Sequence, residues 1–260
     1  MIIIKTKEQI NMMRKGGKIL AEIIKKISKE VKPGVTTGYL EKMACDLIEK
    51  AGGRPSFKGY KSMLDAKAFP TAFCASINDE IVHAPALPSR ELKQGDIIGL
   101  DLGIEYPAIN GYYTDMAVTV PVGKVSKEVK KLIKTTKKSL DLAIAQVKSG
   151  NDLNDIGRAI QQHAEKNGFS VVRDLVGHGV GVDVHEEPQV PNYEILDNSL
   201  ENIVLKEGMV IAIEPMINIG SYNIKCGKDR LTILTTDGKL SAHFEHTVAV
   251  TKDGYEILTI

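Results

Sequence analysis

The chain has 260 residues, of which 43% are hydrophobic and 26% are charged, and its formal net charge at pH 7 is +1. This balance is typical of a globular protein with a sizeable core and argues against a dedicated DNA-binding protein. No apolar run approaches the roughly 20 residues that span a bilayer, and the N-terminal stretch lacks the order of a signal peptide. Three cysteines are too few for a disulfide framework. We therefore expect a cytoplasmic protein that binds neither DNA nor membranes.

The first part of the chain predicts two helices and then a hairpin. Apolar residues at helical spacing favour a helix over 7–30 and a second helix over 36–51. Two apolar strands follow at 95–101 and 113–120. The segment 107–111 between them contains proline, asparagine and glycine, which are typical of turns, so the two strands are expected to pair.

The same order of elements recurs later in the chain. A helix is expected over 126–147, and residues 147–168 resemble residues 31–52, with Asn151 or Asp152 as the expected N-cap. The strand segments 208–214 and 243–250 then resemble the two strands of the first part. This internal repeat points to a related supersecondary unit built twice.

We therefore predict one α+β catalytic domain over 1–260, with two pseudo-symmetric halves at about 1–123 and 124–260. Helices would cover a curved, mainly antiparallel sheet. No flexible or charge-rich linker separates the halves.

The repeat aligns Asp101 with Glu214 and Asp115 with Glu245, so each half carries two carboxylates on apolar strands. Buried carboxylates that converge repel one another unless cations or protons balance them. Two divalent ions would do so, with His178 as the single nitrogen ligand, and such a ligand set suits Mn, Fe(II), Co or Zn. Taken alone, each of these residues is more often an ordinary turn, cap or loop residue.

Five motifs then carry a resemblance to a family. The stretches GHGVGVDVHEEP, IGLDLGI, YTDMAVTV, IAIEPM and FEHTVAV resemble the metal-ligand motifs of type I methionine aminopeptidases, which belong to the pita-bread metallopeptidases. The resemblance implies the pita-bread fold. It also implies that two divalent metal ions are bound, with Asp115 and Glu245 as bridging ligands and Asp101, His178 and Glu214 as the others.

The resemblance further implies a reaction. The substrate would be the N-terminus of a nascent polypeptide, from which methionine is removed when the second residue is small. Water activated by the two metal ions would hydrolyse the peptide bond, and Glu214 would take and return the proton. His83 would contact the scissile amide, and His185 would stabilise the carbonyl oxygen.

The methionine pocket is expected to include Cys74 and Phe69. Leu231 stands where such enzymes commonly have tryptophan, and His243 stands where they commonly have glutamine. Leu231 is therefore a candidate substrate-binding residue. His243 is either an additional group at the metals or a residue of the surrounding layer or rim.

Three alternatives stay open. Type II enzymes carry a long insertion between the positions of Glu214 and Glu245, and this segment is short here. Prolidases and Xaa-Pro aminopeptidases share the ligand motifs but usually carry a large N-terminal domain, for which the segment before His83 leaves no room. A non-catalytic relative that acts as a binding module would typically have lost ligands.

The helix expected over 126–147 carries a stripe of lysines, namely Lys127, Lys130, Lys131, Lys134, Lys137 and Lys138. Such a stripe is most often a solvated helix face. The sharper hypothesis is a transient ribosome contact through ribosomal RNA. The expected oligomeric state is a monomer.

Overall fold

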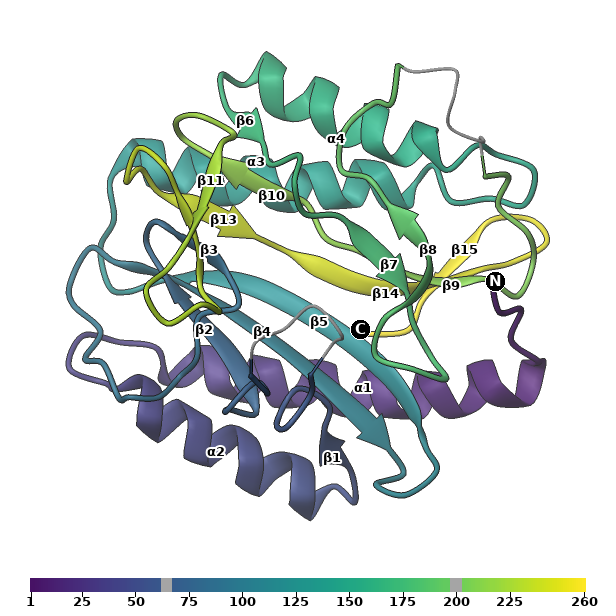
Figure 1. Ribbon diagram of the computed structural model, residues 1–260, viewed down its shortest axis with the longest axis horizontal. Coiled ribbons are helices and arrows are strands. Elements are labelled where there is room, and N and C mark those ends of the chain that lie inside the picture. The colour runs from purple at the N-terminus through teal and green to yellow at the C-terminus, as the bar shows by residue number, and fades with distance from the viewer. Residues whose placement is uncertain (62–66, 197–202) are drawn as a thin grey trace.

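The computed structural model describes residues 1–61, 67–196 and 203–260. A large curved sheet carries two pairs of helices, α1 with α2 along one part and α3 with α4 along the other (Figure 1). Within the described residues, none of the helices is both long and apolar enough to cross a membrane. The helices are α1 (Lys7–Glu30), α2 (Thr37–Lys50), α3 (Lys127–Ile144) and α4 (Asn154–Lys166), which confirms the expected order of two helices in each half.

The main sheet is antiparallel and follows the order β1-β4-β5-β14-β9-β7-β8, with β2 paired to β4 and β15 paired to β14. Its strands are β1 (Arg54–Pro55), β2 (Phe73–Ile77), β4 (Ile97–Tyr106), β5 (Tyr112–Pro121), β7 (Gly177–Gly179), β8 (Glu186–Val190), β9 (Val210–Ile213), β14 (Glu245–Val250) and β15 (Tyr255–Ile257).

Two smaller sheets of three strands complete the fold. One contains β6 (Ser170–Val171), β10 (Met216–Asn218) and β13 (Ser241–His243), and the other contains β3 (Glu80–Val82), β11 (Ile224–Cys226) and β12 (Ile233–Thr235).

The helix starts follow the sequence signals with one difference. Thr36 caps α2 at the predicted start of that helix, because its side chain accepts the Tyr39 backbone N–H. In α4, Leu153 stands at the cap position and has no side-chain hydrogen bond. Asp152 instead accepts the Asn154 N–H at 2.8 Å. The predicted capping group is therefore present, but it lies one residue before the cap position.

The strands of the main sheet divide their side chains between two faces. On β4, Leu100 and Leu102 pack with α1 and α2 in one hydrophobic core, and Asp101 between them points to the other face. On β9 and β14, Ile213 and Val248 likewise pack with α3 and α4 in a second core. The helices therefore cover one face of the sheet and leave the other face to polar residues.

The segment before α1 connects the two halves. The Lys5 N–H donates to the Gly208 carbonyl at 2.8 Å, and the Lys5 ammonium forms an ion pair with the Glu186 carboxylate. These two side chains are only 1% and 3% exposed. Burial lowers the pKa of Lys5, and the contact with Glu186 opposes this effect. Glu186 also accepts the Asp183 N–H at 3.0 Å, so the ion pair holds the loop that leads to His185.

We expect Lys5→Met to lower the free energy of unfolding by about 3–5 kcal/mol, because it leaves the Glu186 carboxylate buried without a cation. Chemical denaturation would measure the change. The double variant Lys5→Met/Glu186→Gln should recover most of the loss, and Lys7→Met, at an exposed lysine, is the control. A single Lys5→Met variant as stable as the parent protein would contradict this role.

Candidate metal centre and active site

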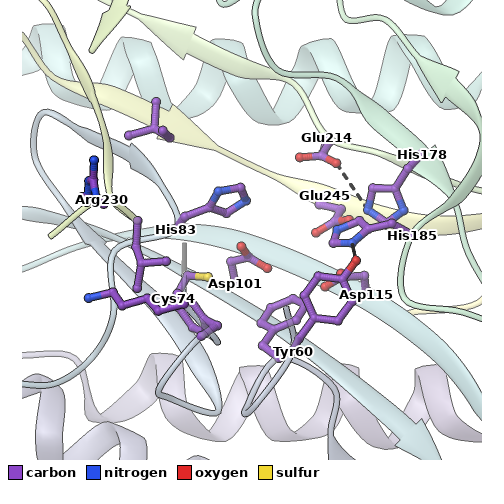
Figure 2. A pocket seen from close by; sticks show the side chains of 15 residues that line it. Tyr60, Cys74, His83, Asp101, Asp115, His178, His185, Glu214, Arg230 and Glu245 are labelled. Carbon is purple, nitrogen blue, oxygen red and sulfur yellow. Dashed lines mark hydrogen bonds and ion pairs between the residues drawn. The ribbon is translucent and has the colours of Figure 1, made fainter. Parts of the chain in front are cut away.

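Four carboxylate side chains gather on the sheet face that the helices leave open (Figure 2). Asp101 of β4 lies opposite Ala117 of β5, which in turn lies opposite Glu245 of β14. Asp115 precedes Ala117 by two residues and shares its face. Glu214 directly follows β9, the strand beside β14. The predicted hairpin therefore brings the two aspartates together as diagonal neighbours.

The centre of this arrangement has a local twofold symmetry. Glu245 of β14 lies opposite Ala117 of β5. At the position related by this twofold symmetry, Asp115 faces Thr247. The Asp115 N–H donates to the Thr247 hydroxyl at 2.8 Å, and that hydroxyl donates to the Asp115 carbonyl at 2.8 Å. The repeat aligns Asp115 with Glu245, so equivalent residues from the two halves meet where β5 and β14 pair.

His178 of β7 reaches the carboxylates because glycines surround it. A Cβ atom at Gly177 would lie 2.3 Å from the Ala212 carbonyl oxygen, and one at Gly179 would lie 2.3 Å from the Glu187 carbonyl oxygen. The His178 Nδ1 atom lies 2.8 Å from the Gly179 carbonyl, which can only accept, so Nδ1 carries the proton. The Nε2 lone pair therefore faces Glu214, whose Oε1 atom is 3.6 Å away.

These side chains fit a divalent metal site. Asp115, His178 and Glu245 each offer a ligand atom, and the three atoms lie within 4.8 Å of one another. Oxygen ligands with one imidazole are a common set for divalent transition metals. The contact of His178 Nδ1 with a backbone carbonyl also presents Nε2 in the orientation seen in metal ligands.

The electrostatics of the site favour cations. Burial raises the pKa of Asp101 to about 6 and that of Glu214 to about 7. Burial, and then repulsion from the neighbouring carboxylates, raises the pKa values of Asp115 and Glu245 well above the ordinary value. Among the described residues, none of the four forms an ion pair with lysine or arginine. The negative charges therefore need bound cations or protons.

The two histidines with implied catalytic roles lie beside these groups (Figure 2). His185 stacks edge-on against His178, with the ring centroids 4.4 Å apart. Its Nδ1 atom lies 2.8 Å from the Tyr60 hydroxyl. His83 lines the same cavity and holds a left-handed backbone conformation, with φ at 59°. Such a conformation is uncommon for a residue other than glycine and is typical of functional sites.

His243 lies in the layer behind the carboxylates rather than at the rim. Its side chain is 3% exposed, and its Nε2 atom lies 3.5 Å from Glu214 Oε2. Since Glu214 Oε1 faces His178, the Glu214 carboxylate lies between two imidazoles. Burial lowers the pKa of His243, so this ring is neutral at pH 7.

The carboxylates and histidines open into a cavity of about 400 Å³. The residues expected around methionine, Phe69, Cys74 and Leu231, also line this cavity. Cys74 of β2 lies opposite Asp101 in the sheet. Burial raises the pKa of the Cys74 thiol well above its ordinary value, so it contributes an uncharged wall.

The sequence analysis missed several lining residues. Phe57, Tyr60, Lys67, Arg230 and Ile233 all contribute to the cavity. They lie outside the repeated motifs, and four of them come from loops, so neither spacing nor periodicity marks them. The contact between Tyr60 and His185 joins residues that are 125 positions apart, and it depends on the fold.

Comparisons with known proteins agree with this geometry. Residues 11–252 match the model of metallopeptidase family M24. A methionine aminopeptidase of Clostridium perfringens is 46% identical, and methionine aminopeptidase 1 of Bacillus subtilis is 45% identical. In both cases the alignment covers 100% of this chain and 99% of the relative.

Solved structures give the same result. The methionine aminopeptidase of Thermotoga maritima is 39% identical with a TM-score of 0.92, and the match covers 100% of this chain and 99% of that chain. A prolidase of Pyrococcus horikoshii shares the fold at 21% identity and a TM-score of 0.77, but this chain covers only 63% of it. The pita-bread fold is therefore confirmed. The chain belongs to metallopeptidase family M24 and, within it, to the methionine aminopeptidases.

Proposed function

We propose that this enzyme removes the N-terminal methionine of a polypeptide when the second residue is small, by hydrolysis at a site with two metal ions. The observation that carries the proposal is the convergence of four carboxylates, three of them buried and that of Glu214 only 13% exposed, with one imidazole in a single cavity. The names of its relatives support the choice of methionine at the N-terminus.

Five residues would hold the two divalent ions, namely Asp101, Asp115, His178, Glu214 and Glu245. Asp115 and Glu245 are the proposed shared ligands, because they lie on either side of the local twofold symmetry between β5 and β14. Four carboxylates would be neutralised by two doubly charged ions. The ligand set suits Mn, Fe(II), Co or Zn.

When bound, two such ions supply Lewis acidity and lower the pKa of a water molecule. Glu214 would take the proton of that water and return it to the leaving amine. The position of Glu214 supports this role, because its carboxylate directly follows β9 and lines the cavity beside His178 and the other three carboxylates. The phenol of Tyr60 would donate to His185 Nδ1, which leaves the Nε2–H of His185 to donate to the developing oxyanion.

The remaining residues would position the substrate. His83 would contact the scissile amide, and the α-amine would lie near Asp101. Phe69, Cys74 and Leu231 would surround the methionine side chain. A cavity of about 400 Å³ has room for methionine and for a small second residue.

Several expectations about partners and context stay predictions. We propose a monomer that works in the cytoplasm on nascent chains. The six lysines of α3 are all exposed, which supports the proposed contact with ribosomal RNA.

The substrate preference can be tested with the peptides Met-Ala-Ser, Met-Lys-Ser, Leu-Ala-Ser and Ala-Pro-Ser, and with metal-free enzyme loaded with Mn, Fe(II), Co or Zn. We expect hydrolysis of Met-Ala-Ser alone. Glu214→Gln should lower kcat by about 100-fold or more, because the proton acceptor is lost. Cleavage of Ala-Pro-Ser would favour an Xaa-Pro peptidase. Absence of any cleavage in the presence of two bound ions would favour a binding module.

The raised pKa values make the stability of the metal-free protein depend on pH. Glu214, with a pKa of about 7, and Asp115 and Glu245, whose pKa values burial raises well above the ordinary value, bind protons more tightly in the folded than in the unfolded chain. The folded state therefore holds more protons than the unfolded state, and the free energy of unfolding falls as the pH rises through about 7, the pKa of Glu214. The buried His243, whose pKa is lowered, stays neutral in this range and does not offset the fall.

We expect the Tm of the metal-free protein to fall by about 3–5 °C between pH 6.5 and 8, and added Mn²⁺ to reverse the fall at pH 8. Scanning calorimetry with a chelator present would measure it. Glu214→Gln should reduce the slope. A Tm that rises over this range would contradict the raised pKa values.

The ribosome contact can be tested by reversing Lys127, Lys130, Lys134 and Lys138 to glutamate. We expect loss of co-sedimentation with ribosomes at low salt, because fewer phosphates are neutralised. The same reversal at four exposed lysines of α1 (Lys15, Lys18, Lys26 and Lys29) changes the net charge equally and should have a smaller effect. Equal losses in both variants would mean that net charge, not the α3 surface, governs binding.

A further inference from the structure

The cavity has a second charged end, which the proposed reaction does not use. Two cationic side chains among the described residues also line this cavity, namely those of Lys67 and Arg230. Figure 2 shows Arg230 at the end of the cavity away from Glu245 and His178, with His83 and Cys74 between them. We call Lys67 and Arg230 the basic mouth. Both residues are exposed, so the basic mouth faces the solvent side of the cavity.

Arg230 is held in place by a tightly bonded turn. The Gly227 N–H donates to the Thr232 carbonyl at 2.7 Å, and the Arg230 N–H donates to the Gly227 carbonyl at 3.0 Å. The Asp229 carboxylate accepts the Thr232 hydroxyl at 2.6 Å and the Leu231 and Thr232 N–H groups at 3.0 Å each. Burial raises the pKa of this carboxyl, but these bonds outweigh burial and lower it. The turn is thus fixed by its own hydrogen bonds and does not depend on the Arg230 side chain.

The backbone of Arg230 carries a cost that glycine would avoid. Its φ angle is 62°, in the left-handed region that favours glycine. A residue other than glycine at such a position is typical of a site where the side chain has a role. Here the side chain lines the cavity beside Leu231, so the role concerns what enters the cavity.

The charge balance identifies the kind of ligand. Two divalent ions would neutralise the four carboxylates, and the remaining charges of the cavity lining would be those of Lys67 and Arg230. Lys67 lies near enough to Asp229 to help lower the pKa of that carboxyl, so Arg230 is the main cation of the basic mouth. A guanidinium offers paired donors that match a carboxylate. Because Lys67 and Arg230 are exposed, a polypeptide that has its first residue at the carboxylates can extend past them into solvent.

We propose that the basic mouth is a specificity determinant that favours polypeptides with an acidic side chain at the third or fourth residue. This inference rests on the proposed function, since it requires the N-terminus of the substrate to lie at the carboxylates. A lysine at the same positions would be disfavoured by like-charge repulsion.

The test uses C-terminally amidated peptides, in which the side chain supplies the only carboxylate. The set is Met-Ala-Ser-Ser-Gly, Met-Ala-Asp-Ser-Gly, Met-Ala-Ser-Asp-Gly and Met-Ala-Lys-Ser-Gly, with the Mn²⁺-loaded enzyme at low salt. We expect kcat/KM for the better aspartate peptide to exceed that of the serine peptide by about threefold. The ratio should shrink in 0.5 M NaCl, because the charges are exposed and screened.

Two variants separate this role from a structural one. Arg230→Gly removes the side chain and relieves the left-handed backbone, so it should keep or raise the Tm while the aspartate-to-serine ratio falls. Combined with Lys67→Gln, it should bring the ratio to about one. Lys228→Gln is the matched control, because Lys228 belongs to the same turn but does not line the cavity. Its ratio should equal that of the parent enzyme.

A second measurement keeps this test independent of hydrolysis. Calorimetric binding of the same peptides to the Mn²⁺-loaded Glu214→Gln variant should show the same order of Kd values. A parent enzyme that cleaves or binds the aspartate and serine peptides equally at low salt would overturn the inference and leave the proposed function intact. Peptides that bind in the expected order but are never cleaved would instead count against the proposed reaction alone.

Discussion

The gathering of four carboxylates on one face of a sheet, three of them buried, is the constraint on which the rest of the structure depends. Burial and mutual repulsion raise the pKa values of Asp115 and Glu245, and a protein keeps such groups together only where protons or cations balance them. The apolar side chains of the same strands therefore face the helices, and the acidic face opens into a cavity. His178 can approach this face because the neighbouring glycines allow close backbone contact.

Much of this arrangement could be predicted from the sequence, because it follows from periodicity and repetition. The helices over 7–30 and 36–51 follow from apolar spacing, and the equivalent positions of Asp101 and Glu214 on strands of the two parts follow from the repeat. The contribution of loops could not be predicted in this way. Tyr60 lies in the cavity with a hydrogen bond to His185, which is distant in the sequence. Arg230 lies there because its turn is fixed by internal hydrogen bonds. Neither residue belongs to a pattern that the residue spacing reveals.

The backbone conformations show where the fold accepts a cost. Within the described residues, Asn78, His83, Asn110 and Arg230 are the positions other than glycine with positive φ. Asparagine tolerates this conformation in turns. Histidine and arginine tolerate it less well, and both of these residues line the cavity. Their strain is offset by the structure around them, as the hydrogen bonds of the turn at Arg230 illustrate, so the costly positions coincide with the site.

The seam between β5 and β14 has a consequence for the origin of the chain's architecture. The two halves join there, with Glu245 opposite Ala117 and His246 opposite Met116. Separated along this seam, each half would present an unpaired strand edge, and exposed edges pair readily with other strands. Because the seam is locally symmetric, the strand that best fits each edge is its own counterpart. Of the five side chains proposed as ligands, Asp101 and Asp115 precede this seam in the chain and His178, Glu214 and Glu245 follow them from later strands, so a chain cut between β5 and β7 would divide the proposed set between its two parts.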